Sequence, residues 1–260
     1  MPDKQKAQFP TEIVSLPSKG ALYSKESSLS KGEIEIKYMT AREEDILTSP
    51  NLIRRGVVID KLLESLVVDE SINLDDILIG DKNALMVSAR VLGYGKNYEF
   101  ETNCPSCSER NQDNIDLTTL KDRKIDHSIF KNGLNEFEFK LPSSKRTITF
   151  KLLTQRDERE VDNELKSLKK ISAKSSVESE VTTRLKKALL SIEGDTDRTK
   201  VNSFVDNEFL SRDSMAFREH LGNMTPDVDM TYIFTCEFCN YDEEVTVPMT
   251  VQFFWPTARR

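Results

Sequence analysis

The sequence predicts an α+β protein of two pseudo-repeated halves, joined by a four-cysteine site of zinc-ribbon type. All four cysteines fall into two Cys-x-x-Cys pairs, at positions 104 and 107 and at positions 236 and 239. Segments that alternate apolar and polar residues are interleaved with segments of helical periodicity. The same order of elements, ending each time in a cysteine pair, occurs twice along the chain. These three observations together predict the fold class.

Each cysteine pair is enclosed by segments with strand character. Tyr98–Thr102 leads into the first pair and Thr231–Thr235 into the second, and a polar strand-like segment follows each. A tight turn between two strands presents both thiolates on one side, as in a zinc knuckle. The sequence therefore predicts one tetrahedral, structural Zn²⁺ site, with iron as an alternative metal, and its ligands are Cys104, Cys107, Cys236 and Cys239.

Composition narrows the class of protein. The 260 residues are 37% hydrophobic and 31% charged, which is typical of a soluble protein with one larger or two modest domains. We expect no membrane span and no signal peptide, because no apolar run approaches the required length. In a reducing cytoplasm, close cysteine pairs favour metal binding over disulfides. The net charge of −7 makes nucleic acid an unlikely partner.

The first half is expected to span residues 16–117, after an N-terminal arm at residues 1–15. Gly32–Met39 alternates apolar and polar residues, which predicts a half-buried strand. Thr40 and Glu43 form a capping-box pattern that predicts a helix from Ala41 to Leu47. Two further helices are predicted, one over Val57–Val68 and one capped by Asp81 and stopped by Gly93 and Gly95.

The second half is expected to span residues 129–250, after a polar linker at 118–128. Two strands, Phe137–Leu141 and Thr147–Leu153, are predicted around a turn at Pro142–Lys145. Thr154–Asp157 resembles the start of a charged helix that runs to Ile171. Three more helices are predicted from apolar periodicity, over Val177–Ile192, around Val201–Val205, and over Ser211–Leu221 with Gly222 as its stop.

The two halves share local sequence features. Glu35–Glu44 matches Thr149–Glu158 in pattern, and each segment follows a Leu-Pro-Ser turn, one at Leu16 and one at Leu141. Asp81 precedes Cys104 by the same number of residues as Asp213 precedes Cys236. We interpret these features as a diverged internal duplication, in which the metal joins two related halves. The alternative is that two unrelated α+β segments share common capping chemistry.

The sequence offers few groups of residues that could act together in catalysis. The chain has two histidines, His127 in the linker and His220 near a helix end, and neither is placed beside a nucleophile. A closed site of four thiolates leaves no coordination position for a reactive water. Thiol–disulfide exchange is disfavoured because strands, rather than a helix start, flank both cysteine pairs. The sequence therefore predicts a protein that is not an enzyme and has no small-molecule substrate.

The last ten residues, 251–260, form an aromatic tail. Phe253, Phe254 and Trp255 are consecutive, and aromatic side chains of this kind can anchor a protein interface. We expect these three residues to bind a partner protein. The alternative is that the tail folds back and covers the core of this chain.

Five motifs together resemble a known family. They are Leu16-Pro-Ser-Lys-Gly20, Thr40-x-x-Glu43-Glu44, the Cys104-Pro-x-Cys107 turn, Pro226-Asp-Val-Asp229, and Phe253-Phe-Trp-Pro256. The chain resembles the baseplate hub subunits of T4-like contractile-tailed bacteriophages over nearly its whole length. The resemblance implies a non-enzymatic virion or assembly protein that binds other hub proteins or the tail tape-measure protein. It also implies synthesis in the host bacterial cytoplasm, and leaves open whether the protein stays in the finished tail baseplate.

Two other functions are compatible with the cysteine pairs. A zinc-ribbon module that binds nucleic acid or RNA polymerase would lose affinity steeply with salt, and the acidic composition argues against it. A metal-dependent hydrolase would need an exchangeable position on the metal, which four thiolates do not leave.

Overall fold

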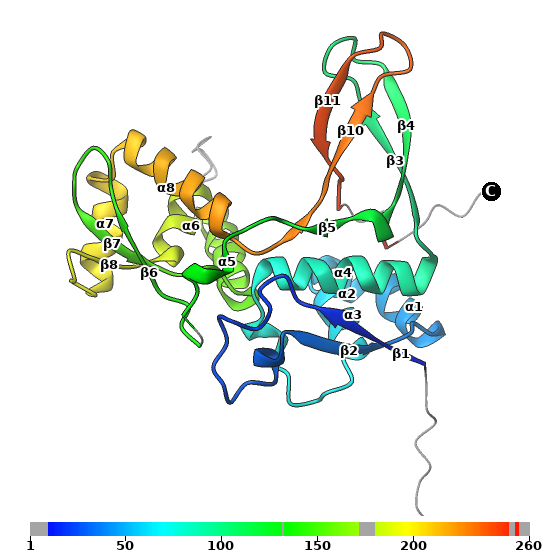
Figure 1. Cartoon of the computed structure of the whole chain (residues 1–260), viewed down its shortest axis with the longest axis horizontal. Coiled ribbons are helices and arrows are strands. Elements are labelled where there is room, and N and C mark those ends of the chain that lie inside the picture. Colours follow the sequence, from blue (N-terminus) through cyan, green and yellow to red (C-terminus); the bar gives the residue numbers. More distant parts are fainter. Residues whose placement is uncertain (1–9, 132, 172–179, 250–252, 255–260) are drawn as a thin grey trace, which may run out of the picture.

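The structure is a computed structural model, and it describes residues 10–131, 133–171, 180–249 and 253–254. Helices and short sheets form an elongated body, and two β-hairpins project from it side by side (Figure 1). The mixture of helix and sheet confirms the predicted α+β class.

The first part of the chain contributes the β1–β2 sheet, four helices and the first projecting hairpin. Its helices and strands are β1 (Thr11–Ser15), β2 (Glu33–Lys37), α1 (Ala41–Thr48), α2 (Pro50–Arg55), α3 (Val58–Leu66), α4 (Ile79–Tyr94), β3 (Asn97–Asn103) and β4 (Arg110–Asp116). Four short 3₁₀ helices lie between residues 28 and 129. They are η1 (Ser28–Lys31), η2 (Leu74–Asp76), η3 (Leu117–Thr119) and η4 (His127–Ile129).

The remaining part contributes a three-stranded sheet, four helices and the second hairpin. Its elements are β5 (Lys121–Asp122), β6 (Phe137–Lys140), β7 (Thr147–Phe150), α5 (Gln155–Ile171), α6 (Glu180–Ala188), β8 (Leu189–Ile192), α7 (Arg198–Asn207), α8 (Ser211–Met224), β9 (Val228–Asp229), β10 (Thr231–Thr235) and β11 (Asp242–Thr246).

All strand pairs in the described residues are antiparallel. The pairs are β1–β2, β3–β4, β10–β11, β5–β9 and the three-stranded order β6–β7–β8. The β5–β9 pair joins the linker after the first hairpin to the segment just before the second. Residues 11–15 of the expected N-terminal arm form β1, which pairs with β2 along its whole length.

The two predicted helix starts use the same chemistry. The Thr40 backbone N–H donates to Glu43 Oε2 over 2.8 Å at the start of α1. The Thr154 backbone N–H donates to Asp157 Oδ2 over 3.0 Å at the start of α5. A lysine three residues before each threonine pairs with the same carboxylate, Lys37 with Glu43 and Lys151 with Asp157. These reciprocal bonds satisfy backbone groups that a helix start leaves free.

Asp81 does not cap α4, contrary to the expectation from the sequence. Leu78 occupies the N-cap position of α4 and makes no side-chain capping bond. Asp81 lies inside the first turn with its carboxylate buried. That carboxylate accepts hydrogen bonds from the Ser18 backbone N–H, the Ser18 hydroxyl and the Tyr23 hydroxyl. Because the Asp81 carboxylate bonds to these distant residues, it is not available to cap the start of α4.

An equivalent contact occurs at α8. Asp213 is the third residue of α8, as Asp81 is of α4, and it is also buried. Its carboxylate accepts hydrogen bonds from the backbone N–H groups of Ser143 and Ser144, over 2.6 and 2.9 Å. Both Leu-Pro-Ser turns are therefore held by a buried aspartate near the start of a helix.

The predicted helix over Val177–Ile192 is only partly correct. Residues 172–179 lie outside the described residues, and α6 begins at Glu180. Its last four predicted residues instead form β8, because Leu189 and Ser191 pair with β7. Gly93 and Gly222 were expected to stop their helices, but both lie within them, and only Gly95, with φ of 84°, ends α4.

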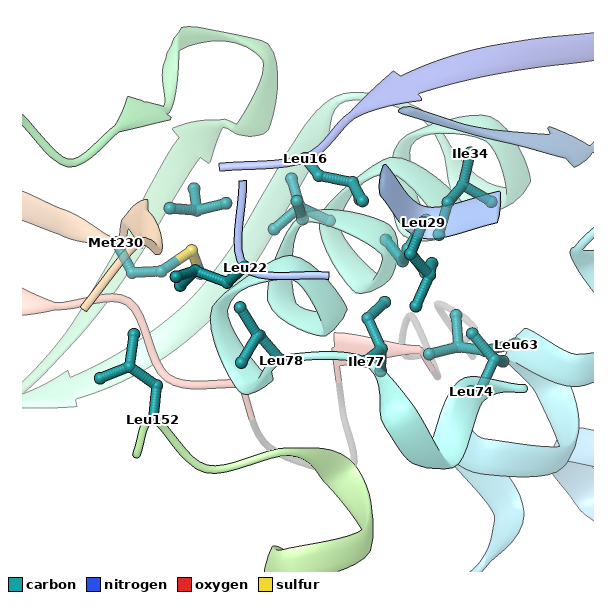
Figure 2. Close-up of a cluster of buried hydrophobic side chains, with 14 of the residues drawn as sticks. Leu16, Leu22, Leu29, Ile34, Leu63, Leu74, Ile77, Leu78, Leu152 and Met230 are labelled. Carbon is teal, nitrogen blue, oxygen red and sulfur yellow. The ribbon is translucent and has the colours of Figure 1, made fainter. Parts of the chain in front are cut away.

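One large hydrophobic core joins the two parts of the chain. Figure 2 shows Leu152 and Met230, from the second half, in the same cluster as Leu22 and Leu78 from the first. Ile148, Phe150 and Phe217 are also fully buried in this core. The two halves are therefore held together by shared apolar packing as well as by contacts between the hairpins.

None of the described helices is both long enough and apolar enough to cross a bilayer.

Candidate metal centre

The cysteine pairs lie in the tight turns at the ends of the two projecting hairpins. In the first turn, the Cys104 backbone N–H donates to the Glu109 carbonyl over 2.9 Å. In the second, the Cys236 backbone N–H donates to the Tyr241 carbonyl over the same distance. The strands that the sequence predicts before each pair are therefore confirmed, and both hairpins close in the same way.

The two turns also share an uncommon backbone conformation. Ser108 and Asn240, each four residues after the first cysteine of its pair, have positive φ angles of 62° and 56°. Their backbone N–H groups donate to the carbonyls of Cys104 and Cys236, both over 2.9 Å. A positive φ at one position reverses the chain quickly. Each turn therefore places two cysteines close together on one side.

The four sulfurs meet where the hairpin turns face each other. All four Sγ atoms lie within 4.8 Å of one another. Cys104 Sγ is 3.7 Å from Cys239 Sγ, and Cys107 Sγ is 3.6 Å from Cys236 Sγ. Sulfurs bound to zinc at about 2.3 Å in a tetrahedron lie roughly 3.8 Å apart. Two of the sulfur–sulfur distances are therefore close to those of a four-thiolate metal site, and the four residues could hold a metal ion.

A small apolar cluster supports the sulfurs from below. Phe234 is fully buried between the hairpins, together with Cys104 and Cys236, and Tyr241 packs against this group. Cys107 and Cys239, in contrast, are exposed at the outer side of the turns. Each pair thus supplies one buried and one exposed thiol.

Tyr232 connects the hairpins below this cluster. Its hydroxyl donates to Asp113 Oδ2 over 3.1 Å and lies 3.0 Å from Thr102 Oγ1. Its ring packs edge-on against Phe100, with ring centroids 5.4 Å apart. The hairpins therefore contact each other along their length and not only at the sulfurs.

Asn111 is a further residue of the site that the sequence did not indicate. Its side chain is buried, and its Nδ2 lies 3.6 Å from Cys236 Sγ and donates to the Glu109 carbonyl. Its Oδ1 accepts from the Glu237 backbone N–H over 2.9 Å. One amide on the first hairpin thus bonds to both a sulfur and the backbone of the second.

The surroundings of the thiols alter their acidity in opposite directions. Burial acts to raise the pKa of Cys236, but hydrogen bonds from the Cys239 and Phe238 backbone and from Asn111 lower that pKa to about 6. At Cys107 a backbone hydrogen bond from Glu109 acts to lower the pKa, but desolvation and the neighbouring thiols raise it to about 12. Cys236 is therefore ionised more readily than Cys107, and ionisation is what metal binding requires of a thiol.

The aromatic residues expected at a partner interface have a different environment. Phe253 and Phe254 are 1% and 2% exposed. Phe253 packs edge-on against Tyr98 at the base of the first hairpin, with centroids 5.0 Å apart. Both residues cover the core of this chain, which is the alternative that the sequence left open. Trp255 lies outside the described residues.

The two histidines lie apart from the sulfur cluster. His127 packs edge-on against Phe130, and His220 stacks on Phe139 with ring centroids 4.6 Å apart. Desolvation lowers the pKa of both imidazoles, which favours their neutral form. Neither histidine joins the group of potential metal ligands found in the described residues.

Comparison with known families identifies the protein class. Residues 14–255 match the family described as T4 bacteriophage base plate protein. The chain belongs to this family. The matched region of this baseplate protein contains both hairpins, all four cysteines and the aromatic residues of the tail. No curated protein and no solved structure matched it.

Proposed function

We propose that this protein is a non-enzymatic structural or assembly component of the baseplate hub in a contractile phage tail, acting through protein–protein contacts. The observation that carries the proposal is the family match, which covers the body and the projecting hairpins together. The resemblance of the sequence motifs to hub subunits supports the position in the hub. Other hub proteins or the tape-measure protein are the partners that this position implies.

We further propose that the four cysteines bind one structural Zn²⁺ and that no metal-bound water takes part in chemistry. The sulfur spacing supports this assignment, since the four donors lie within 4.8 Å of one another and two of the sulfur–sulfur distances are close to the roughly 3.8 Å of a zinc site. Bonds from Asn111 to the sulfur and backbone of the second hairpin would orient the ligands, as outer-shell groups do at other zinc sites. The metal would fix the relative position of the hairpins.

The shared local structures support an internal duplication. The capped helix starts at Thr40 and Thr154 correspond, with lysine and carboxylate partners at equal offsets. The turns held by Asp81 and Asp213 also correspond. These three local features correspond at matching offsets in the two halves, which supports a common origin. We therefore propose that each half contributes one hairpin to the metal site.

The charge of the hairpins favours a protein partner over nucleic acid. We name residues 97–116 and 231–246, which contain both hairpins, the hairpin pair. The hairpin pair contains nine acidic residues and one basic residue, Arg110. Carboxylates at this density repel a phosphate backbone. A zinc-ribbon module for nucleic acid would require the opposite charge.

Metal content per chain tests the structural zinc site. Native protein is analysed by elemental mass spectrometry, and its thiols are titrated before and after chelation. We expect one zinc per chain and four thiols that react only after chelation. Cys107→Ser should lower metal retention, whereas Ser106→Ala, in the same turn but outside the sulfur set, should retain it. Four freely reactive thiols in metal-free native protein would rule out the site.

The role in the tail is tested in the phage itself. A stop codon early in this gene should prevent baseplate completion, and electron microscopy of infected cells should then show a loss of assembled tails. Wild-type protein supplied from a plasmid should restore them. Infectious particles of normal appearance without the protein would overturn the proposed role.

A further inference from the structure

The outer face of the β10–β11 hairpin has no partner among the described residues. The two strands form a sheet of their own, in which Ile233 lies opposite Glu244 and Thr235 opposite Asp242. On the inner side Tyr232 and Phe234 alternate with these residues and face the first hairpin. Because side chains alternate along a strand, the outer side is left with Ile233 at its centre and carboxylates beside it.

Two large apolar side chains on this hairpin are strongly exposed. Ile233 is 68% exposed and Phe238, in the turn between Cys236 and Cys239, is 62% exposed. The hairpin projects from the body, so both lie on a part of the molecule that a partner can approach (Figure 1). The body has an exposed apolar residue of similar degree in Met215, at 62%. Met215 therefore serves as a matched reference.

The carboxylates around these two residues are free of ion pairs in the described structure. Glu237 is next to Phe238, and Asp242 and Glu244 lie on the outer strand beside Ile233. None of the three carboxylates has a hydrogen-bonded or ionic partner among the described side chains. The second hairpin contains no basic residue to neutralise them.

The negative charge of the protein is concentrated in the hairpin pair. The whole chain has a net charge of −7, and the hairpin pair, with nine acidic residues and one basic residue, is more negative than that. The rest of the chain is therefore close to neutral. The remainder of a second copy has almost no net charge with which to attract the hairpins, and two copies of the hairpins repel each other. Anionic lipids and nucleic acids are disfavoured for the same reason.

We propose that the exposed surface of the second hairpin, comprising Ile233 on β10, Asp242 and Glu244 on β11, and Glu237 and Phe238 in the turn between them, docks onto a basic surface of another baseplate protein. The proposal rests on the proposed function and adds to it the surface and the chemistry of its partner. Ile233 and Phe238 enter apolar depressions on the partner, and lysine or arginine side chains around those depressions pair with the carboxylates. The metal centre behind this face keeps it rigid.

The two kinds of contact have separable effects on binding kinetics. Long-range attraction between the carboxylates and a basic partner raises the association rate and makes it sensitive to salt. Apolar anchors buried at the centre of an interface mainly slow dissociation. Variants of each kind should therefore change different rate constants.

The experiment uses the full-length, zinc-loaded chain and, as probes, the structural baseplate proteins of the same phage, each purified separately. Binding rates are measured at low and at physiological salt. We expect wild-type protein to bind at least one probe, and the double variant Ile233→Ser, Phe238→Ser to dissociate at least about ten-fold faster. Asp242→Asn with Glu244→Gln should slow association about ten-fold at low salt and flatten its salt dependence. Met215→Ser should match wild type.

The possible results separate this proposal from the proposed function. If wild-type protein binds a probe and both pairs of substitutions behave like Met215→Ser, the docking face is wrong and the baseplate role stands. Binding to none of the baseplate proteins would contradict the proposed function and the docking face together. Association of the chain with itself that the two pairs of substitutions abolish would overturn the choice of partner. Zinc content, measured for every variant, verifies that the hairpins are intact.

Discussion

Asn111 links the two hairpins beside the sulfur cluster. Its amide bonds to Cys236 Sγ and to the Glu237 backbone N–H, both on the other hairpin, and to the Glu109 carbonyl on its own. Because the side chain is buried, water cannot replace these bonds without opening the hairpins. Asn111 therefore fixes the second knuckle relative to the first.

Substitution of Asn111 should weaken metal binding without removing a ligand. We expect Asn111→Ala to lower zinc affinity about 10- to 100-fold, the usual effect of losing an outer-shell partner. Competition with a chromogenic chelator measures the affinity. Asn114→Ala, an exposed asparagine on the same strand, is the matched control. Equal affinities of the two variants would show that the Asn111 bonds do not support the metal.

The grouping of the four cysteines could be predicted from the sequence, whereas the contact of Asn111 with them could not. Cys-x-x-Cys spacing is local, so four residues are enough to indicate each pair. The contact from Asn111 to Cys236 joins residues 125 positions apart, and no local pattern encodes it. The same reason explains Asp81, for which capping was the nearest local role, although its bonds reach Ser18, 63 positions away.

At the scale of elements, the sequence predicted those whose signal is local. The capping box at Thr40 and the strand over Thr231–Thr235 agree with the structure. The β8 strand was missed because Leu189–Ile192 continues the apolar spacing of the preceding helix, and only pairing with β7 makes it extended. The two-residue strands β5 and β9 likewise exist through their mutual pairing. Tertiary contacts therefore determine the secondary structure of each of these segments.

The contact that Tyr232 makes between the hairpins should make the stability of the fold depend on pH in the alkaline range. Burial raises the pKa of Tyr232 to about 12, the Thr102 hydrogen bond acts against this shift, and the nearby Asp113 charge adds to it. The ordinary pKa of tyrosine is about 10. Because the folded protein holds the proton more tightly than the unfolded chain, Tyr232 stabilises the fold fully below pH 10. This stabilisation is lost as the pH rises from about 10 to about 12.

Ultraviolet titration of tyrosinate tests this expectation. Subtracting the absorbance titration of Tyr232→Phe from that of wild type isolates the ionisation of Tyr232. This difference should have its midpoint near pH 12. The difference in unfolding free energy between the two proteins should also shrink above pH 10. A difference titration with its midpoint near pH 10 would mean that Tyr232 is solvated and that the hairpins separate in solution.

At the scale of the whole molecule, the body and the hairpin pair differ in what holds them together. The body contains one extended hydrophobic core with residues from both halves. Tyr98 and Phe100, at the base of the hairpin pair, belong to this core, whereas the part near the turns has a separate cluster with three buried members, Cys104, Phe234 and Cys236. So small a core gives little stability by itself, and small domains of this kind depend on metal or disulfides.

Removal of metal should therefore loosen the hairpins and leave the body folded. We expect chelation to increase amide hydrogen exchange across residues 97–116 and 231–246, with little change in α4 and in the β6–β7–β8 sheet. Exchange followed by mass spectrometry resolves these segments, and added zinc should restore protection. Equal loss of protection in α4 would show that the metal stabilises the entire fold.

The placement of one cysteine pair on each hairpin also orders events during synthesis. Cys236 follows Cys107 by 129 residues, so a ribosome must add almost the whole chain before the four sulfurs can meet. Closing a loop of that length costs an unfolded chain about 5 kcal/mol of conformational entropy. We expect packing of the body to offset this cost, because it brings the two hairpins together. A chain that ends before the second pair offers only two sulfurs, so a metal bound by all four would mark a chain that has been translated past Cys239.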